Sequence, residues 1–123
     1  MTSSMIRAIR GATTTEIDTP EAIHDAVQEL LRAMLETNNI VIDSVVNVFF
    51  TSTSDLVSAF PATAARSVGF ADVPLMCASE IAVPGSLPRC LRIMMVVSTE
   101  RDRSEIRHVY LRQAVSLRDD LAK

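Results

Sequence analysis

The sequence predicts an α+β domain in which a mixed five-stranded β-sheet carries one long and one short helix, largely on one side. The first observation is a long amphipathic pattern with helical spacing. The second is a set of five short apolar segments, one before this helix and four after it, with the length and composition of strands. With 123 residues, 48% of them hydrophobic, and neither repeat nor linker, the chain is expected to form a single domain over residues 1–123.

The first strand is expected at Met5–Thr15, where apolar residues are mixed with arginines and followed by threonines. Arg7 and Arg10 lie three residues apart, and an odd separation places them on opposite faces of a strand. One of them can therefore face a cavity while the other faces solvent. The alternative is that both are solvated residues at a strand edge.

The long helix is expected to begin at Thr19-Pro20-Glu21 and to end at Asn38-Asn39. Thr19 can accept hydrogen bonds from early backbone amides, proline fits the first helical position, and glutamate complements the helix dipole. The apolar residues recur at steps of three and four and form one stripe that packs on the sheet, made of Ile23, Ala26, Val27, Leu30, Leu31, Met34 and Leu35.

A second strand and a short helix follow. Val45–Thr51 is apolar almost throughout, as expected of a strand. Ala62–Val68 is predicted to be the short helix, with Pro61 in its first turn and Gly69 at its end. Arg66 falls on this helix, and local evidence indicates a plain surface arginine.

The third and fourth strands each carry a charge at one end. Val73–Cys77 is predicted to lie at an edge, or to begin at Pro74, because proline cannot donate to a sheet. The carboxylate of Glu80, in an apolar neighbourhood, is either turned outward or paired. Leu91–Ser98 reads as a strand covered on both faces. Near its start, Arg92 either points to solvent or offers a fixed cation to an anion, because a buried guanidinium requires one.

The last strand is expected at Ile106–Leu111, and Arg112–Lys123 is expected to be a loosely held tail. The sheet face opposite the long helix still requires cover, since several strands are too apolar to face water. Oligomerisation through that face is the simplest way to cover it.

Composition excludes several classes of function. The net charge is −3 without a basic run, which argues against nucleic acid as a partner. Eleven of the twelve basic residues are arginine, which either genomic base composition or selection for carboxylate recognition explains. No apolar run approaches the roughly 20 residues that span a bilayer, and the first five residues do not resemble a signal peptide. Two widely spaced cysteines indicate a reducing compartment, so the protein is expected to be cytoplasmic.

The motifs of nucleophilic, metal and phosphate chemistry are missing from the sequence, so neither a metal nor a cofactor is expected. Both histidines, His24 and His108, are expected on solvated faces. The polar groups that remain near strand ends suit a small, multiply anionic ligand that also carries a hydroxyl. Such a pocket can catalyse a reaction that needs binding, orientation and charge stabilisation. These groups are Arg10, Arg66, Glu80, Arg92 and Tyr110.

Five segments, in order and covering nearly the whole chain from Met5 to Leu121, resemble the monofunctional AroH-class chorismate mutases first associated with bacilli. The resemblance implies a homotrimeric pseudo-α/β-barrel with three active sites at subunit interfaces, and the Claisen rearrangement of chorismate to prephenate in phenylalanine and tyrosine biosynthesis. The segments are Ile9–Thr14, Ser54–Leu56 with Phe60–Ala62 and Arg66, Val73–Pro74 with Cys77 and Glu80, Cys90–Met95, and Ile106–Leu111.

The resemblance also implies roles for individual residues. Arg92 would place its guanidinium at the ether oxygen, while Arg10 and Tyr110 would bind a carboxylate. Glu80 would accept a hydrogen bond from the ring hydroxyl, with Cys77 beside it.

At the rim of the implied site, Phe60 would form an apolar wall and Arg66 would stand at the mouth. Leu117 and Arg118 would close over the ligand. The chain departs from the family at Thr63, where the bacillus-type enzyme has a lysine, so the mouth is expected to be less positive.

One alternative comes from another class of protein. Trimers of the RidA/YjgF group have a similar topology and bind small carboxylates or hydrolyse reactive imines in interface clefts. A purely structural trimer is a third reading, which leaves the charges without a purpose. The joint presence of Arg10, Glu80 and Tyr110 with Arg92 favours the mutase.

Overall fold

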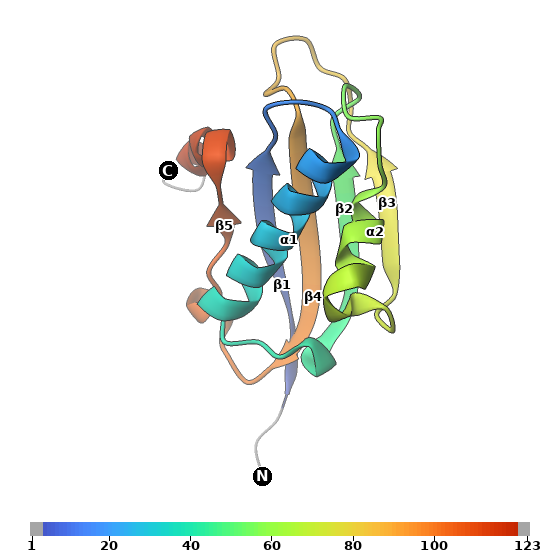
Figure 1. Cartoon of the computed structure of the whole chain (residues 1–123). Coiled ribbons are helices and arrows are strands. Elements are labelled where there is room, and N and C mark those ends of the chain that lie inside the picture. Colours follow the sequence, from blue (N-terminus) through green and yellow to red (C-terminus); the bar gives the residue numbers. More distant parts are fainter. Residues whose placement is uncertain (1–3, 121–123) are drawn as a thin grey trace.

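A computed structural model describes residues 4–120. Residues 1–3, at the N-terminus that does not resemble a signal peptide, and residues 121–123, at the end of the predicted tail, lie outside this range. The described chain forms one mixed five-stranded sheet in the order β3-β2-β4-β1-β5 (Figure 1). Strand β4 runs antiparallel between β1 and β2, while β5 is parallel to β1 and β3 is parallel to β2. The strands are β1 Met5–Thr14, β2 Val45–Ser52, β3 Leu75–Ser79, β4 Cys90–Thr99 and β5 Val109–Tyr110.

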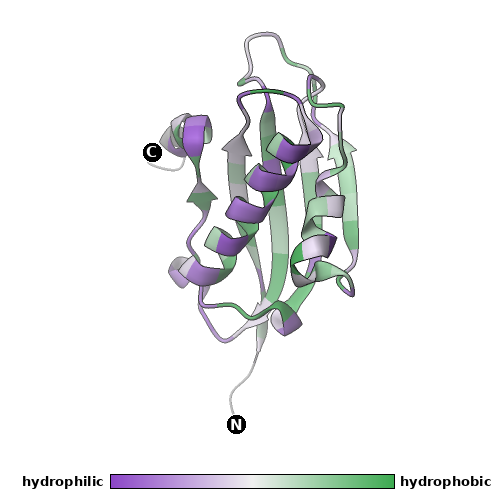
Figure 2. Cartoon of the chain, viewed as in Figure 1, coloured by the Kyte–Doolittle hydropathy of each residue, from purple (hydrophilic) through white to green (hydrophobic). Residues whose placement is uncertain are grey.

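The two helices, α1 (Pro20–Thr37) and α2 (Pro61–Ala65), lie on the same face of this sheet (Figure 1). The predicted start of α1 is confirmed, because the Thr19 side chain accepts a hydrogen bond from the Ala22 amide at 3.1 Å. Figure 2 shows the hydrophilic residues of α1 along its outer surface. The α+β class and the one-sided helical layer are therefore as the sequence predicts.

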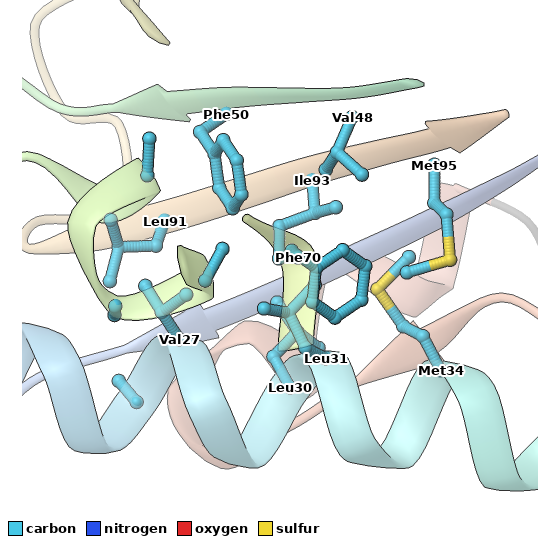
Figure 3. Packing of buried hydrophobic residues seen from close by; sticks show 14 of the residues in the cluster. Val27, Leu30, Leu31, Met34, Val48, Phe50, Phe70, Leu91, Ile93 and Met95 are labelled. Carbon is cyan, nitrogen blue, oxygen red and sulfur yellow. The ribbon is translucent and has the colours of Figure 1, made fainter. Parts of the chain in front are cut away.

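The core lies between α1 and the sheet. In Figure 3, Leu30, Leu31 and Met34 of α1 face the strands, and the ring of Phe70 packs among them. Leu91, Ile93 and Met95 from β4, and Val48 and Phe50 from β2, belong to the same cluster. Each such side chain contributes about 1.5–3 kcal/mol when fully buried, so β4 is held firmly by this layer.

The short helix is shorter than predicted, since α2 ends at Ala65 and the chain continues through an irregular turn over Arg66–Phe70. Gly69 has a φ of 104°, and a Cβ built there would lie 2.8 Å from Cδ1 of Ile42. Both the backbone conformation and the space therefore favour glycine at this position.

Along strand β4, buried and exposed side chains alternate. The prediction that both faces of this strand are covered is therefore wrong for the single chain. Leu91, Ile93 and Met95 are buried against the helices, whereas Arg92 and Met94 are exposed on the opposite face. Side chains alternate along a strand, and this chain places helices over one face only. The second face stays open.

This helix-free face is rich in exposed apolar side chains. Ile6 is 60% exposed, Phe49 is 45% exposed and Met76 is 61% exposed. None of the helices within residues 4–120 combines the length and the apolar character needed to cross a lipid bilayer.

Candidate active site

Two rows of side chains cross the helix-free face. In the first row, Arg92 on β4 pairs with Thr51 on β2 and with Ala12 on β1, and Ala12 pairs in turn with Tyr110 on β5. Paired residues in neighbouring strands project on the same face, so this register places an arginine, a hydroxyl and a phenol side by side.

In the second row, two residues further along β4, Met94 pairs with Phe49 on β2 and with Arg10 on β1. This row adds apolar surface and a second cation beside the first. Paired residues 41 positions or more apart in the sequence thus meet only because of the strand order.

The two rows form a pocket of about 290 Å3. Its charged groups are Arg10 and Arg92, and Tyr110 adds a hydroxyl. Four predicted site residues, including Leu117, therefore line one pocket. The complete lining is Arg10, Gly11, Ala12, Phe49, Thr51, Arg92, Ile93, Met94, Tyr110 and Leu117.

Leu117 reaches this pocket because the C-terminal segment is anchored. Residues Arg112–Asp120 form a 3-10 helix, η4. Arg112 donates from Nη1 to the Thr14 carbonyl at 3.0 Å, and the Gln113 amide donates to the Thr14 hydroxyl at 3.2 Å. Ala114 is fully buried. The prediction of a loosely held tail is thus wrong for the start of this segment, because hydrogen bonds and a buried side chain tie it to β1.

Glu80 is paired with Arg92. Its Oε1 lies 3.3 Å from the Arg92 Nε, and its Oε2 accepts a hydrogen bond from the Thr51 hydroxyl at 2.9 Å. The Glu80 side chain is 16% exposed and the Arg92 side chain is 51% exposed. Of the alternatives for these two residues, the structure favours a paired carboxylate that holds a partly exposed cation at the pocket.

Cys90 lies on the same face of β4 as Arg92 and is almost fully buried. Burial raises the pKa of its thiol, and the negative charge of Glu80 raises it further. A thiol with a raised pKa holds little thiolate near neutrality, so nucleophilic chemistry at Cys90 is disfavoured.

Hydrogen bonds from side chains, more than strand pairing, hold the segment that carries Tyr110. The Arg10 amide donates to Nδ1 of His108 at 2.9 Å. The Asn38 side chain accepts from the Arg107 amide at 2.8 Å and donates to the Arg107 carbonyl at 2.9 Å. These contacts explain why the predicted strand Ile106–Leu111 shrinks to Val109–Tyr110.

The prediction that His108 is solvated is also wrong. Its ring is half-buried and accepts the hydrogen bond from Arg10. Burial lowers the pKa of His108, and the positive charge of Arg10 lowers it further. The ring is therefore neutral at pH 7, as its acceptor role requires.

A second hollow, of about 550 Å3, contains Phe60 and Cys77. Phe60 is 73% exposed and Cys77 is half-buried. In the part of the chain that the structure describes, this hollow shares none of its lining residues with the pocket around Arg92. The predicted site residues are thus divided between two places on one chain.

The other two predicted site residues, Arg66 and Arg118, are exposed. Among the described residues that line either hollow, neither arginine appears. Thr63 is exposed on α2.

Six residues of the pocket were not among the predicted site residues, namely Gly11, Ala12, Phe49, Thr51, Ile93 and Met94. Phe49 and Met94 read as ordinary strand residues, and Thr51 reads as the end of a strand. The pairing of β2 with β4 is what places Phe49 and Thr51 at this pocket. The available signal was the period of two, which places Met94 on the same face as Arg92.

The family of type I chorismate mutases matches residues 6–121. A chorismate mutase AroH from Thermus thermophilus is 55% identical over 118 residues, which cover 95% of this chain and 97% of that protein. The chorismate mutase AroH of Bacillus subtilis is 44% identical over 119 residues, or 96% and 94% of the two chains. A solved chorismate mutase from Clostridium thermocellum superimposes with a TM-score of 0.88 at 47% identity, over 89% of this chain and 98% of that one.

Proposed function

This chain belongs to the type I chorismate mutase family, and on that premise we propose that it rearranges chorismate to prephenate in the pocket around Arg92. The enzyme is an isomerase of aromatic amino acid biosynthesis. The observation that carries the assignment of the site is the Arg92–Glu80 ion pair beside a pocket lined by Arg10 and Tyr110. The match to the mutase family over residues 6–121 favours this function over the RidA/YjgF alternative.

The reaction needs little of the protein beyond geometry and charge. Chorismate is a dianion with a ring hydroxyl and an ether oxygen. Its rearrangement breaks the C–O bond and forms a C–C bond in one cyclic step, without a proton transfer or a bond to the enzyme. A pocket that selects the compact conformer and stabilises developing charge therefore suffices.

Arg92 supplies the charge stabilisation in this proposal. Negative charge grows on the ether oxygen as the C–O bond breaks, and a guanidinium can donate a hydrogen bond to it. The ion pair with Glu80 is made at Nε, and in this proposal the two terminal nitrogens face the ligand. Loss of a fixed donor of this kind costs roughly 3–4 kcal/mol of barrier.

The remaining groups of the pocket orient the dianion. We assign Arg10 and Tyr110 to a carboxylate, because both line the same pocket as Arg92. Glu80 would accept a hydrogen bond from the ring hydroxyl, since an ionised carboxylate has lone pairs beyond those used by Thr51 and Arg92.

The site is proposed to be completed by a second copy of the chain in a homotrimeric pseudo-barrel. Two observations support this. The pocket opens on an uncovered, apolar face, and the hollow with Phe60 and Cys77 is separate from it. In the assembly, Phe60 and Cys77 of one subunit would meet the pocket of the next, with Arg66 at the mouth. Leu117 and Arg118 would close the pocket from η4.

We also infer a single chorismate mutase domain over residues 1–123, because the family match extends over residues 6–121. A cytoplasmic location is consistent with the two free cysteines, Cys77 and Cys90.

The test is to follow the ultraviolet absorbance of chorismate after adding the purified protein, and to identify the product by NMR. Absorbance is expected to fall at a rate proportional to protein concentration, with prephenate as the product. Arg92→Ala serves as the control for a contaminating mutase. A folded protein that leaves chorismate unchanged would overturn the proposal.

A further inference from the structure

We propose that Thr51 is a positioning residue of this site, which acts on Arg92 through Glu80. The inference rests on the proposed function, in which Arg92 stabilises charge on the ether oxygen. Thr51 lines the pocket, and its hydroxyl is one of the two groups that hold the Glu80 carboxylate.

Three contacts link Thr51 to Arg92 through Glu80. The backbone amide of Glu80 donates to the carbonyl of Ser52 at 3.0 Å, which fixes the Glu80 backbone at the end of β3. The Thr51 hydroxyl donates to Oε2 of Glu80 at 2.9 Å. Oε1 of Glu80 then lies 3.3 Å from Nε of Arg92. The carboxylate is thus held between a strand hydroxyl and the catalytic guanidinium.

The register makes Thr51 suited to this role. Thr51 and Arg92 are paired residues of β2 and β4, so their side chains leave the sheet next to each other. Threonine is branched at Cβ and has few accessible side-chain conformations. An ionised carboxylate has no proton to give, so the hydroxyl must be the donor. The result is a short, stiff donor aimed at one carboxylate oxygen.

Arg92 needs such support because about half of its side chain is exposed. A catalytic group that is displaced by about 1 Å from its productive position can slow the reaction by about 100-fold. Without the Thr51 hydroxyl, Oε2 of Glu80 loses a charge-assisted hydrogen bond and the carboxylate gains freedom to rotate. The guanidinium that it holds gains the same freedom.

The decisive comparison is Thr51→Val against Thr51→Ser. Valine keeps the branched shape without the hydroxyl, whereas serine keeps the hydroxyl. Hydrogen bonds to charged groups are among the stronger ones in proteins, so we expect Thr51→Val to lower kcat by roughly tenfold or more. KM should change little, because the support acts on a contact made in the transition state. Thr51→Ser should keep kcat near that of the wild type.

Thr37→Val is the matched control, because Thr37 is exposed at the end of α1 and is not among the residues that line the pocket. It should leave both kinetic constants unchanged. Thermal midpoint and molecular mass are measured for every variant. Thr51→Ala provides a second removal of the hydroxyl if the valine variant does not fold, with the same expected loss of kcat.

The outcomes separate this inference from the proposed function. If Thr51→Val and Thr51→Ala keep kcat while Arg92→Lys loses it, the role of Thr51 is overturned and the function stands. A rise in KM alone means that the hydroxyl binds substrate directly, which also overturns the positioning role. An equal loss in Thr51→Ser shows that the hydroxyl is not the cause. Full activity in Arg92→Lys removes the proposed mechanism itself.

Discussion

Nε of Arg92 and Oε1 of Glu80 lie 3.3 Å apart at the pocket on the helix-free face of the sheet. The contact joins the one arginine of β4 to a carboxylate just after the edge strand β3. The Glu80 carboxylate therefore lies beside the Nε edge of the guanidinium.

Arg92→Lys is expected to fold and to lose most activity, with kcat lowered by about 10²–10³-fold, the typical cost of removing a fixed donor. Lysine keeps the positive charge but carries it on a flexible stem without the planar fork. Steady-state kinetics with chorismate measure the effect. Arg103→Lys, at an exposed position of the 3-10 helix Arg103–Glu105, is the matched control. A near-normal kcat in Arg92→Lys contradicts the mechanism.

Glu80→Ala is expected to lose activity while its assembly state stays that of the wild type. The substitution removes the partner of Arg92 and the acceptor proposed for the ring hydroxyl, but it does not alter the apolar residues of the open face. Kinetics and light scattering on the same preparation test the two parts together. Dissociation of the variant at concentrations where the wild type is intact would show that Glu80 is structural.

The rate is expected to be independent of pH around neutrality. Arginine does not titrate there, and the rearrangement moves no proton. His108, whose ring orders the backbone next to Arg10, is neutral in this range because burial lowers its pKa. The measurement is kcat in overlapping buffers from pH 7 to pH 9. A bell with limbs inside that range points to general acid–base catalysis and contradicts the prediction.

His108 is expected to make the fold less stable as the pH falls below about 6.5, the usual pKa of histidine. In the folded chain its Nδ1 accepts from the Arg10 amide, and its pKa is lowered by burial first and by Arg10 second. Below about pH 6.5 the unfolded chain binds a proton that the folded chain does not, so the free energy of unfolding decreases with falling pH.

Urea denaturation between pH 8 and pH 5 measures this loss. Part of the pH dependence should disappear in His108→Asn, whose side chain does not titrate. Thr37→Val, which changes an exposed side chain that does not titrate, is the control and should keep the wild-type slope. Equal slopes for the wild type and His108→Asn count against the assignment.

Local patterns predict much of this fold, and the pairing of distant strands supplies what they leave out. The cap at Thr19 and the stripe on α1 can be read from spacing because a helix organises residues close in sequence. Arg92 also reads as unusual, since it stands in an apolar strand. Its neighbour Thr51 does not, because their contact depends on the register of β2 against β4. The same holds for η4, whose anchor is the backbone and hydroxyl of Thr14.

The division of the predicted site into two separate hollows leads to a test of the interface. Arg92→Lys breaks the pocket, and Phe60→Asp places a negative charge in the other hollow, at a side chain that is 73% exposed. Each variant alone is expected to be inactive, the second because aspartate repels a dianion. If each site joins the pocket of one subunit to the hollow of the next, randomly mixed trimers contain intact sites, and about a quarter of the wild-type activity should return.

The measurement is kcat per subunit after the two variants are unfolded and refolded together, with each variant refolded alone as the control. If both hollows served one site within a single chain, every site in the mixture would carry a substitution, and activity would stay at the level of the controls.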